Sequence, residues 1–161
     1  MTRRTFALFA GLACAALLTM PAMAAGKPDF TGDWKLNVDK SNFGPIPPPT
    51  SASVKVDHKD PVIKTTTVQS AMDGDHTDSA SYTTDGKESK NDFRGTEAKS
   101  TAKWDGDILV IDTKVDFQGT EVLLKATWKL SEDGKTLNQT TKISTPQGDF
   151  EMAQVLDKVT Q

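Results

Sequence analysis

The segments Phe93-Arg94-Gly95-Thr96-Glu97 and Phe117-Gln118-Gly119-Thr120-Glu121 are near copies, and each is followed at the same offset by a tryptophan, Trp104 and Trp128. The copies begin 24 residues apart. A repeat of this length, with a glycine turn between alternating apolar residues, corresponds to one β-hairpin of two long antiparallel strands. The repeat therefore predicts an antiparallel meander.

Turn sequences that contain glycine or proline punctuate the chain from residue 59 onward. They are of the kind that joins neighbouring strands, namely Lys59-Asp60-Pro61, Asp73-Gly74, Asp85-Gly86, Arg94-Gly95, Asp105-Gly106, Gln118-Gly119, Asp133-Gly134 and Gln147-Gly148. The intervals predict about ten strands, over residues 32–37, 52–58, 62–70, 77–84, 88–93, 96–104, 108–117, 120–130, 136–144 and 150–158. No amphipathic helix is predicted after residue 24.

The predicted strands are long enough to decide between a barrel and a small sandwich. Several have nine to eleven residues, against a usual five or six, and at that length a strand runs about 30 Å. Such strands suit a tilted, closed barrel, which also removes exposed sheet edges. We therefore predict an all-β fold, an antiparallel up-and-down meander of about ten strands closed into a β-barrel.

Alternation along the late strands predicts which side chains face inward. Between residues 108 and 130 the inward set is mostly apolar: Leu109, Ile111, Thr113, Val115, Phe117, Val122, Leu124, Ala126, Trp128 and Leu130. The preceding strand places Ala98, Ser100, Ala102 and Trp104 together, so its inner side is mostly small. Small inward side chains leave space unless bulky neighbours fill it. The interior is thus either a ligand cavity of roughly a few hundred Å³ or a packed or water-filled core that binds nothing in particular.

The outward positions of the same strands carry charge, as at Lys99, Lys103, Asp112, Lys114, Lys125 and Lys129. A charged outer face argues against a barrel that spans an outer membrane, whose outer face is apolar. The whole chain has a net charge of −3. A mildly acidic surface repels phosphate backbones, so nucleic acid is not an expected partner.

Residues 1–24 have the organisation of a cleaved signal peptide. Thr2-Arg3-Arg4 carries positive charge, residues 6–20 form an apolar run, and Ala22-Met23-Ala24 is a small-residue cleavage site. The apolar run is shorter than the ~20 residues of a spanning helix. We expect a mature domain over residues 25–161 that does not span a membrane and lies in the periplasm or outside a bacterial cell. The secretory and twin-arginine routes both fit the arginines.

The only cysteine of the chain, Cys14, lies within the predicted signal peptide. The mature domain therefore cannot form a disulfide, and its core must supply its stability. It also lacks recognised catalytic motifs: His58 and His76 stand in neither a nucleophile elbow nor a metalloprotease helix. The stretch from Asp73 to Asp78 has oxygen and nitrogen donors but lacks the loop of a calcium hand. We expect no enzymatic activity, no cofactor and no metal.

A proline-rich arm over residues 43–51 interrupts the first strands, with Pro45, Pro47, Pro48 and Pro49 in close succession. Prolines favour an extended backbone without amide donors. The arm is predicted to be either a stiff cover over the barrel mouth or a surface spacer.

Three short motifs resemble the calycins, the group that includes lipocalins and fatty-acid-binding proteins. They are Phe30-Thr31-Gly32-Asp33-Trp34-Lys35-Leu36 with Asn42-Phe43, then Lys103-Trp104-Asp105-Gly106, and the closing Leu156-Asp157-Lys158-Val159. The resemblance implies a ten-stranded barrel over nearly the whole mature chain. It also implies a structural role for Trp34, which in calycins closes one end of the barrel against a basic residue of the last strand. Lys158 is the matching candidate here.

The chain departs from fatty-acid-binding proteins in three respects. The proline-rich arm stands where that family has a helical lid. The family holds the ligand carboxylate with an Arg-x-Tyr pair in the last strand, and the matching positions are Gln154 and Leu156. Those proteins are also usually cytosolic, whereas this chain has an export signal. The only arginine after residue 24, Arg94, lies in a predicted turn.

Two functions follow from these expectations. In the first, the barrel is a non-enzymatic carrier of a small apolar or amphipathic molecule, with candidate ligand contacts at Phe117, Trp104, Trp128, Tyr82 and Gln154. Burial of apolar ligand surface would supply most of the affinity. In the second, the barrel is a rigid scaffold without a small-molecule ligand, and the proline-rich arm or the turn tips bind or inhibit another envelope protein.

Overall fold

A computed structural model describes residues 26–72 and 74–160; the predicted signal peptide lies outside the described residues. These residues form ten antiparallel strands and one short 3-10 helix, η1 (Val38–Lys40). The strands are β1 (Gly32–Leu36), β2 (Ser51–Lys59), β3 (Val62–Ala71), β4 (Gly74–Thr83), β5 (Asp85–Phe93), β6 (Thr96–Asp105), β7 (Ile108–Phe117), β8 (Thr120–Leu130), β9 (Thr136–Thr145) and β10 (Gly148–Lys158). The predicted all-β meander is confirmed. The largest differences are at β4 and β5, which begin at Gly74 and Asp85 rather than at residues 77 and 88.

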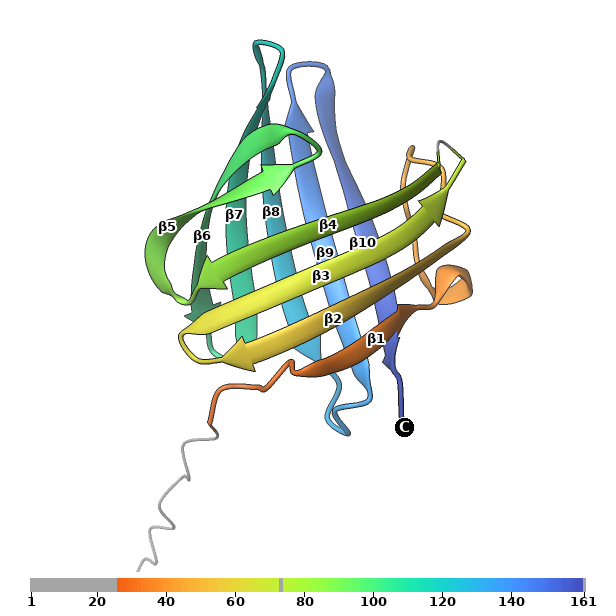
Figure 1. Cartoon of the computed structure of the whole chain (residues 1–161), viewed down its shortest axis with the longest axis vertical. Helices are drawn as coiled ribbons and strands as arrows, with labels where there is room; N and C mark the ends of the chain where they lie inside the picture. Colours follow the sequence, from red (N-terminus) through yellow and green to blue (C-terminus); the bar gives the residue numbers. More distant parts are fainter. Residues whose placement is uncertain (1–25, 73, 161) are drawn as a thin grey trace, which may run out of the picture.

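The ten strands form one sheet that wraps around an interior. Its order is β4-β3-β2-β1-β10-β9-β8-β7-β6-β5, so the first strand pairs with the last, with Trp34 opposite Lys158. Strands β2–β4 cross in front of β7–β10 at a steep angle (Figure 1). Strands that follow one another in the chain are paired by hydrogen bonds from β1 to β4 and again from β5 to β10.

The predicted β-barrel is confirmed, and it is nearly closed. Strands β4 and β5 stand at the two ends of the sheet order, so no ladder joins them although they follow one another in the chain. We call the line between them the seam. A turn sequence predicts that the chain reverses there, but it does not ensure that the two strands then pair along their length.

The repeated segments form two equivalent hairpin tips. Arg94 and Gly95 have φ values of 52° and 80°, and Gln118 and Gly119 have φ values of 55° and 84°. Two successive residues with positive φ define a type I′ turn, whose twist matches that of the flanking strands. In each tip an aspartate caps the turn, since the Gly95 amide donates to Asp92 (3.0 Å) and the Gly119 amide to Asp116 (2.6 Å).

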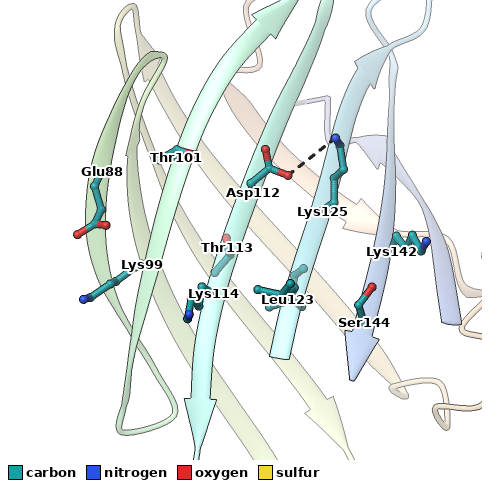
Figure 2. A pocket seen from close by; sticks show the side chains of 11 residues that line it. Glu88, Lys99, Thr101, Asp112, Thr113, Lys114, Leu123, Lys125, Lys142 and Ser144 are labelled. Carbon is teal, nitrogen blue, oxygen red and sulfur yellow. Dashed lines mark ion pairs between the residues drawn. The ribbon is translucent and has the colours of Figure 1, made fainter. Parts of the chain in front are cut away.

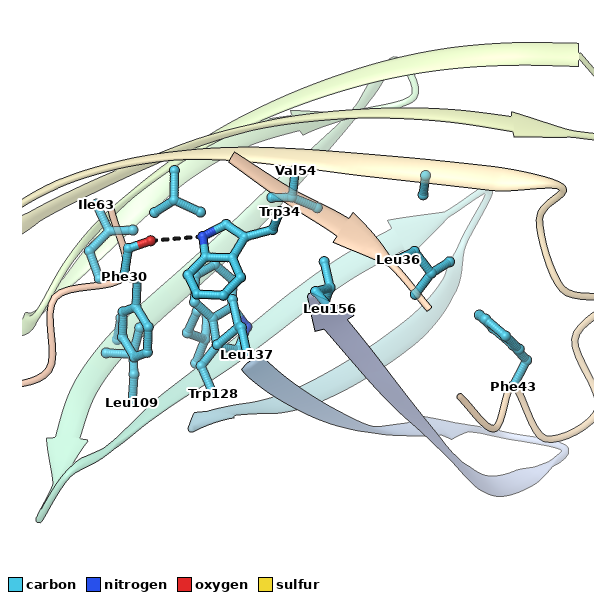
Figure 3. Close-up of a cluster of buried hydrophobic side chains, with 14 residues drawn as sticks. Phe30, Trp34, Leu36, Phe43, Val54, Ile63, Leu109, Trp128, Leu137 and Leu156 are labelled. Carbon is cyan, nitrogen blue, oxygen red and sulfur yellow. Dashed lines mark hydrogen bonds between the residues drawn. The ribbon is translucent and has the colours of Figure 1, made fainter. Parts of the chain in front are cut away.

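An apolar cluster fills one end of the barrel, which we call the closed end (Figure 3). Trp34 and Phe30 are fully buried there, and the Trp34 indole N–H donates to the Phe30 carbonyl at 2.9 Å. Other members are Ile63, Leu109, Trp128, Leu137 and Leu156. Lys158 Nζ lies 5.2 Å from the centroid of the Trp34 ring. The contact is in the range of a cation–π interaction.

The proline-rich arm begins against β10. Asn42 forms an isolated bridge with Ala153, and Phe43 is buried and belongs to the apolar cluster. Gly44 follows with φ of 57°, and a Cβ there would lie 2.9 Å from the Glu151 carbonyl oxygen. Only glycine fits that close approach without a shift of backbone. The arm is therefore anchored at its start, while Ile46 beyond it is 39% exposed.

Candidate functional site

A cavity of about 280 Å³ lies inside the barrel. Its lining comes from β3, β4, β5, β6, β7, β8 and β9, and consists of Thr65, Thr67, Gln69, Asp78, Ser79, Ala80, Tyr82, Asn91, Asp92, Phe93, Ala98, Ser100, Ile111, Thr113, Val115, Leu124, Ala126, Trp128 and Thr141. The volume lies just below the usual range for small-molecule sites. The cavity exists because β6 and β8 present alanine and serine at inward positions where a larger side chain would fill the space.

One side of this cavity, contributed by β6–β8, is largely apolar. Ile111 and Val115 of β7 are buried, and Leu124 of β8 lies beside them in the lining. Trp128 lies where the cavity meets the closed end, since it lines the cavity and also contacts Phe30 edge to face at a centroid distance of 5.6 Å. This wall offers contact to a hydrocarbon surface, and its two hydroxyls, those of Ser100 and Thr113, are hydrogen-bonded to each other at 2.8 Å.

The opposite side, contributed by β3 and β4, is polar. Thr65 and Thr67 point inward from β3, and Asp78 and Tyr82 point inward from β4. Burial raises the pKa of the Tyr82 phenol, so the hydroxyl stays neutral and can both donate and accept. The cavity is thus amphipathic, with hydrogen-bonding groups facing an apolar wall.

The cavity reaches the seam between β4 and β5. Ser79 and Asp92 line it although both are exposed to solvent, which shows that the space continues between the two strands. Nearer the β4–β5 turn the seam is closed by one side chain. The Ser81 amide donates to Asn91 Oδ1 at 2.7 Å, and Asn91 Nδ2 donates to the Ser81 carbonyl at 3.2 Å. Asn91 therefore bridges the seam with the donor and acceptor that a partner backbone would supply.

Replacing Asn91 by alanine is expected to lower the free energy of unfolding by about 1 to 3 kcal/mol. The change removes both hydrogen bonds and leaves the partly buried Ser81 amide and carbonyl without their side-chain partner. Urea denaturation followed by far-UV circular dichroism measures the effect. Asn138→Ala, at an exposed position of β9, is the matched control and should change stability by less than about 0.5 kcal/mol. Equal effects of the two variants would contradict the bridging role.

The predicted ligand contacts occupy different parts of the molecule. Tyr82 and Trp128 lie together in the cavity lining. Trp104 instead stacks on Phe30 at the closed end, with ring centroids 5.6 Å apart. Phe117 lies at its hairpin tip, 36% exposed and 6.0 Å from the ring of Phe93. Gln154 is half-buried on β10, opposite Gln139. The last three are outside the lining, so their contact with a ligand stays a prediction.

Apart from Tyr82, the polar residues of the lining are not among the predicted contacts. Thr65, Thr67 and Asp78 come from strands with weak alternation, in which threonine and serine occupy both faces. Asp78 could have indicated the polar wall from the sequence, because it alternates with Ala80 and Tyr82 and so shares their inward face. A carboxylate at an inward position requires a partner or a solvated cavity.

A hydrogen-bonded cluster around His58 lies at the closed end, next to the apolar cluster. The His58 side chain is 4% exposed and its ring stacks on Phe30 at 5.7 Å. The Phe30 amide donates to His58 Nδ1 at 3.3 Å. Asp60 accepts from the Thr84 hydroxyl at 2.8 Å and from the Trp104 indole N–H at 3.4 Å. These contacts give His58 and Asp60 structural partners.

A second hollow, of about 520 Å³, lies on the outer face of β5–β9 (Figure 2). It is larger than the interior cavity, but several exposed lysines of its lining pair with acidic residues on the same outer face. Lys125 lies 4.0 Å from Asp112 and Lys142 lies 2.9 Å from Asp149, and Lys114 is paired with Glu121. Exposed pairs of this kind contribute little binding energy. We therefore regard the interior cavity as the candidate site.

Within residues 26–72 and 74–160, no group of three or more His, Cys, Asp or Glu side chains is arranged to hold a metal ion. In the same part of the chain, no helix has the length and apolarity needed to cross a membrane.

Comparisons with known proteins give structural neighbours but no sequence relatives. No protein-family model matches the sequence, and no curated protein is significantly similar to it. A secretory abundant heat soluble protein of Ramazzottius varieornatus superposes with a TM-score of 0.63 at 17% identity, over 84% of this chain and 98% of that chain. Zebrafish ileal bile acid-binding protein gives a TM-score of 0.55 at 18% identity, over 81% and 98% of the two chains. Fatty-acid-binding protein 1 of Echinococcus granulosus gives 0.53 at 15% identity, with the same coverage. In fold, this chain is a calycin-like, fatty-acid-binding-protein-like ten-stranded barrel.

Proposed function

We propose that this protein is a non-enzymatic binding protein that holds one small amphipathic molecule inside the barrel. The observation that carries the proposal is the interior cavity of about 280 Å³, with an apolar wall on β6–β8 and a polar wall on β3–β4. The ligand's hydrocarbon part would lie against Leu124 and Trp128. Its polar part would face Thr65 and Tyr82.

The energetics of such a complex rest mainly on apolar burial. At ~25 cal/mol per Å² of buried apolar surface, a ligand that buries about 200 Å² gains on the order of 5 kcal/mol before the cost of immobilisation. The hydroxyls of the polar wall then fix orientation. Because the cavity is small, we expect a compact ligand or a short-chain amphiphile, with any remainder of the molecule extending toward the seam between Ser79 and Asp92.

Two of the structural neighbours support a ligand-binding use of the fold. One is a bile acid-binding protein solved with cholic acid, and another is a fatty-acid-binding protein. At their level of identity they support the shape of the container rather than a particular ligand. The proposal includes export through the signal peptide at residues 1–24, with action in the periplasm or outside the cell.

Uptake of the neutral lipophilic fluorophore N-phenyl-1-naphthylamine tests the proposal directly. We expect saturable fluorescence enhancement at one site per chain of the mature protein, because the cavity removes the fluorophore from water. Native mass spectrometry of the purified protein should in addition show a co-purified small molecule or a one-to-one complex after its addition. No enhancement with a folded protein would contradict the carrier function.

The alternative function, an interaction scaffold for another envelope protein, has one observation in its favour. Ile46 in the proline-rich arm is 39% exposed between prolines that are themselves exposed, so the arm presents an apolar side chain on a stiff backbone. If the protein takes up no fluorophore, we expect deletion of residues 45–48 to abolish capture of an envelope protein while leaving the barrel folded.

A further inference from the structure

We infer that the cavity selects amphiphiles whose polar group donates hydrogen bonds or carries a positive charge, and that it discriminates against carboxylates. The inference rests on the proposed function, because it concerns the ligand of the same cavity. It is carried by the position of one carboxylate, that of Asp78.

Asp78 lies within the polar wall of the cavity. It is half-buried on β4, directly opposite Thr67 of β3, and both residues line the cavity. An ionised carboxylate only accepts hydrogen bonds. Its partners must therefore be donors, and the strongest donor a ligand can offer is a charged ammonium group, since charge-assisted hydrogen bonds are shorter and stronger than neutral ones.

The cavity does not offer a cation to a ligand carboxylate. Among the described residues that line it, none is lysine, arginine or histidine, and the charged ones are Asp78 and Asp92. Asp92 already accepts the Gly95 amide at its hairpin tip. Lysines of β6–β8 alternate with the inward residues and therefore face outward. Lys99, Lys114 and Lys125 line the outer hollow instead. A ligand carboxylate in the cavity would lie near a like charge, without a counterion and in a medium less polar than water.

The other polar groups of the cavity suit a neutral or cationic head group. Thr67 and Thr141 carry hydroxyls that donate or accept as required, and Gln69 adds an amide. Tyr82 stays a neutral phenol because burial opposes its ionisation. The same tail should therefore bind most tightly with an amine, less tightly with an alcohol and least tightly with a carboxylate.

Displacement of bound N-phenyl-1-naphthylamine by decylamine, 1-decanol and decanoate tests this order, because the three competitors share one tail. The titrations use the mature protein at pH 8, where decylamine is a cation and decanoate an anion. We expect decylamine to displace the fluorophore at a concentration about tenfold lower than 1-decanol, and decanoate to be the weakest of the three.

Asp78→Asn should abolish the preference for the amine, so that decylamine and 1-decanol displace the fluorophore from this variant at concentrations within about twofold of each other. Asp112→Asn is the matched control, because it removes one carboxylate from the outer face of the same barrel. If this variant lost the preference equally, net charge rather than the cavity would be responsible and the inference would be overturned. If Asp78→Asn failed to fold, the order measured on the unmodified protein would still decide the matter.

The two ways of failing are distinguishable. A protein that takes up the fluorophore but is displaced by decanoate as readily as by decylamine overturns the donor preference alone. A protein that takes up no fluorophore contradicts the carrier function itself.

Discussion

Replacing Trp34 by alanine is expected to lower the free energy of unfolding by about 3 to 5 kcal/mol, the cost of truncating a large buried aromatic. Trp34 is fully buried at the closed end, and its indole N–H donates to the Phe30 carbonyl at 2.9 Å. Lys158 Nζ, which lies 5.2 Å from the centroid of the same ring, belongs to β10, the last strand, which pairs with β1. Removal of the Trp34 ring therefore loosens both the apolar cluster and the pairing of the first strand with the last.

The measurement is urea denaturation of the mature protein, followed by far-UV circular dichroism so that the signal does not depend on the lost indole. Trp34→Phe is the graded control. It keeps an aromatic ring but not the hydrogen bond, so we expect a smaller loss, on the order of 1 to 2 kcal/mol. A loss below 1 kcal/mol for the alanine variant would show that the closed end does not depend on this side chain. Fluorophore uptake per folded molecule should change little, because Trp34 is not part of the cavity lining.

Filling the cavity should have the largest effect on binding. Ala126 faces the cavity from β8, between Ile111 on one neighbouring strand and Thr141 on the other. It is inward-facing yet only half-buried, so there is open space beside it. In Ala126→Phe the ring would occupy the volume in which we place the ligand's hydrocarbon part. We expect the affinity for N-phenyl-1-naphthylamine to fall at least about tenfold, the equivalent of about 1.4 kcal/mol.

Stability separates this effect from general damage. Overpacking a full core costs about 1 to 3 kcal/mol, whereas a ring that enters open volume should cost less and can even add apolar contact. Ser53→Phe adds the same ring at an exposed position of β2 and should leave uptake unchanged. If Ala126→Phe is stable and still binds the fluorophore at the original affinity, the site is elsewhere, and the outer hollow on β5–β9 becomes the next candidate.

These experiments bear on how a calycin-like barrel acquires its ligand chemistry. The wall that carries Ile111 and Leu124 is suited to any hydrocarbon, and it does not discriminate between head groups. We propose that the few polar groups facing this wall discriminate between head groups, Asp78 above all, because the other carboxylate of the lining, that of Asp92, is engaged in a turn. The charged residues of the cavity lining, Asp78 and Asp92, are both acidic.

Local features of the chain were sufficient to predict the strands and their inward faces. Glycine and aspartate turns mark where the chain reverses, and a period of two separates Leu109, Ile111 and Val115 from the charged residues between them. Both signals depend on neighbours a few residues apart, so they can be read without knowledge of the fold. The repeated segment around Gly95 and Gly119 is the clearest case, since both copies form the same type of turn.

Depth along the barrel axis could not be predicted in the same way. Trp104 and Trp128 hold equivalent positions in the two repeats and both face inward, yet Trp104 stacks on Phe30 at the closed end while Trp128 also lines the cavity. Alternation determines which face a side chain occupies. How far along the axis it lies depends on strand tilt and on register with distant partners, as with Leu109, which pairs with both tryptophans.

The sequence by itself determined the all-β meander, the turns and the separation of apolar from charged faces, because each of these is a property of short stretches of backbone and side chain. Only the tertiary structure decided that β4 and β5 leave a seam bridged by Asn91, and that Asp78 faces an apolar wall across a cavity. The physical reason is that the seam is backbone left unpaired and the cavity is volume left unfilled by side chains. Both depend on how strands distant in the sequence pack in the whole barrel.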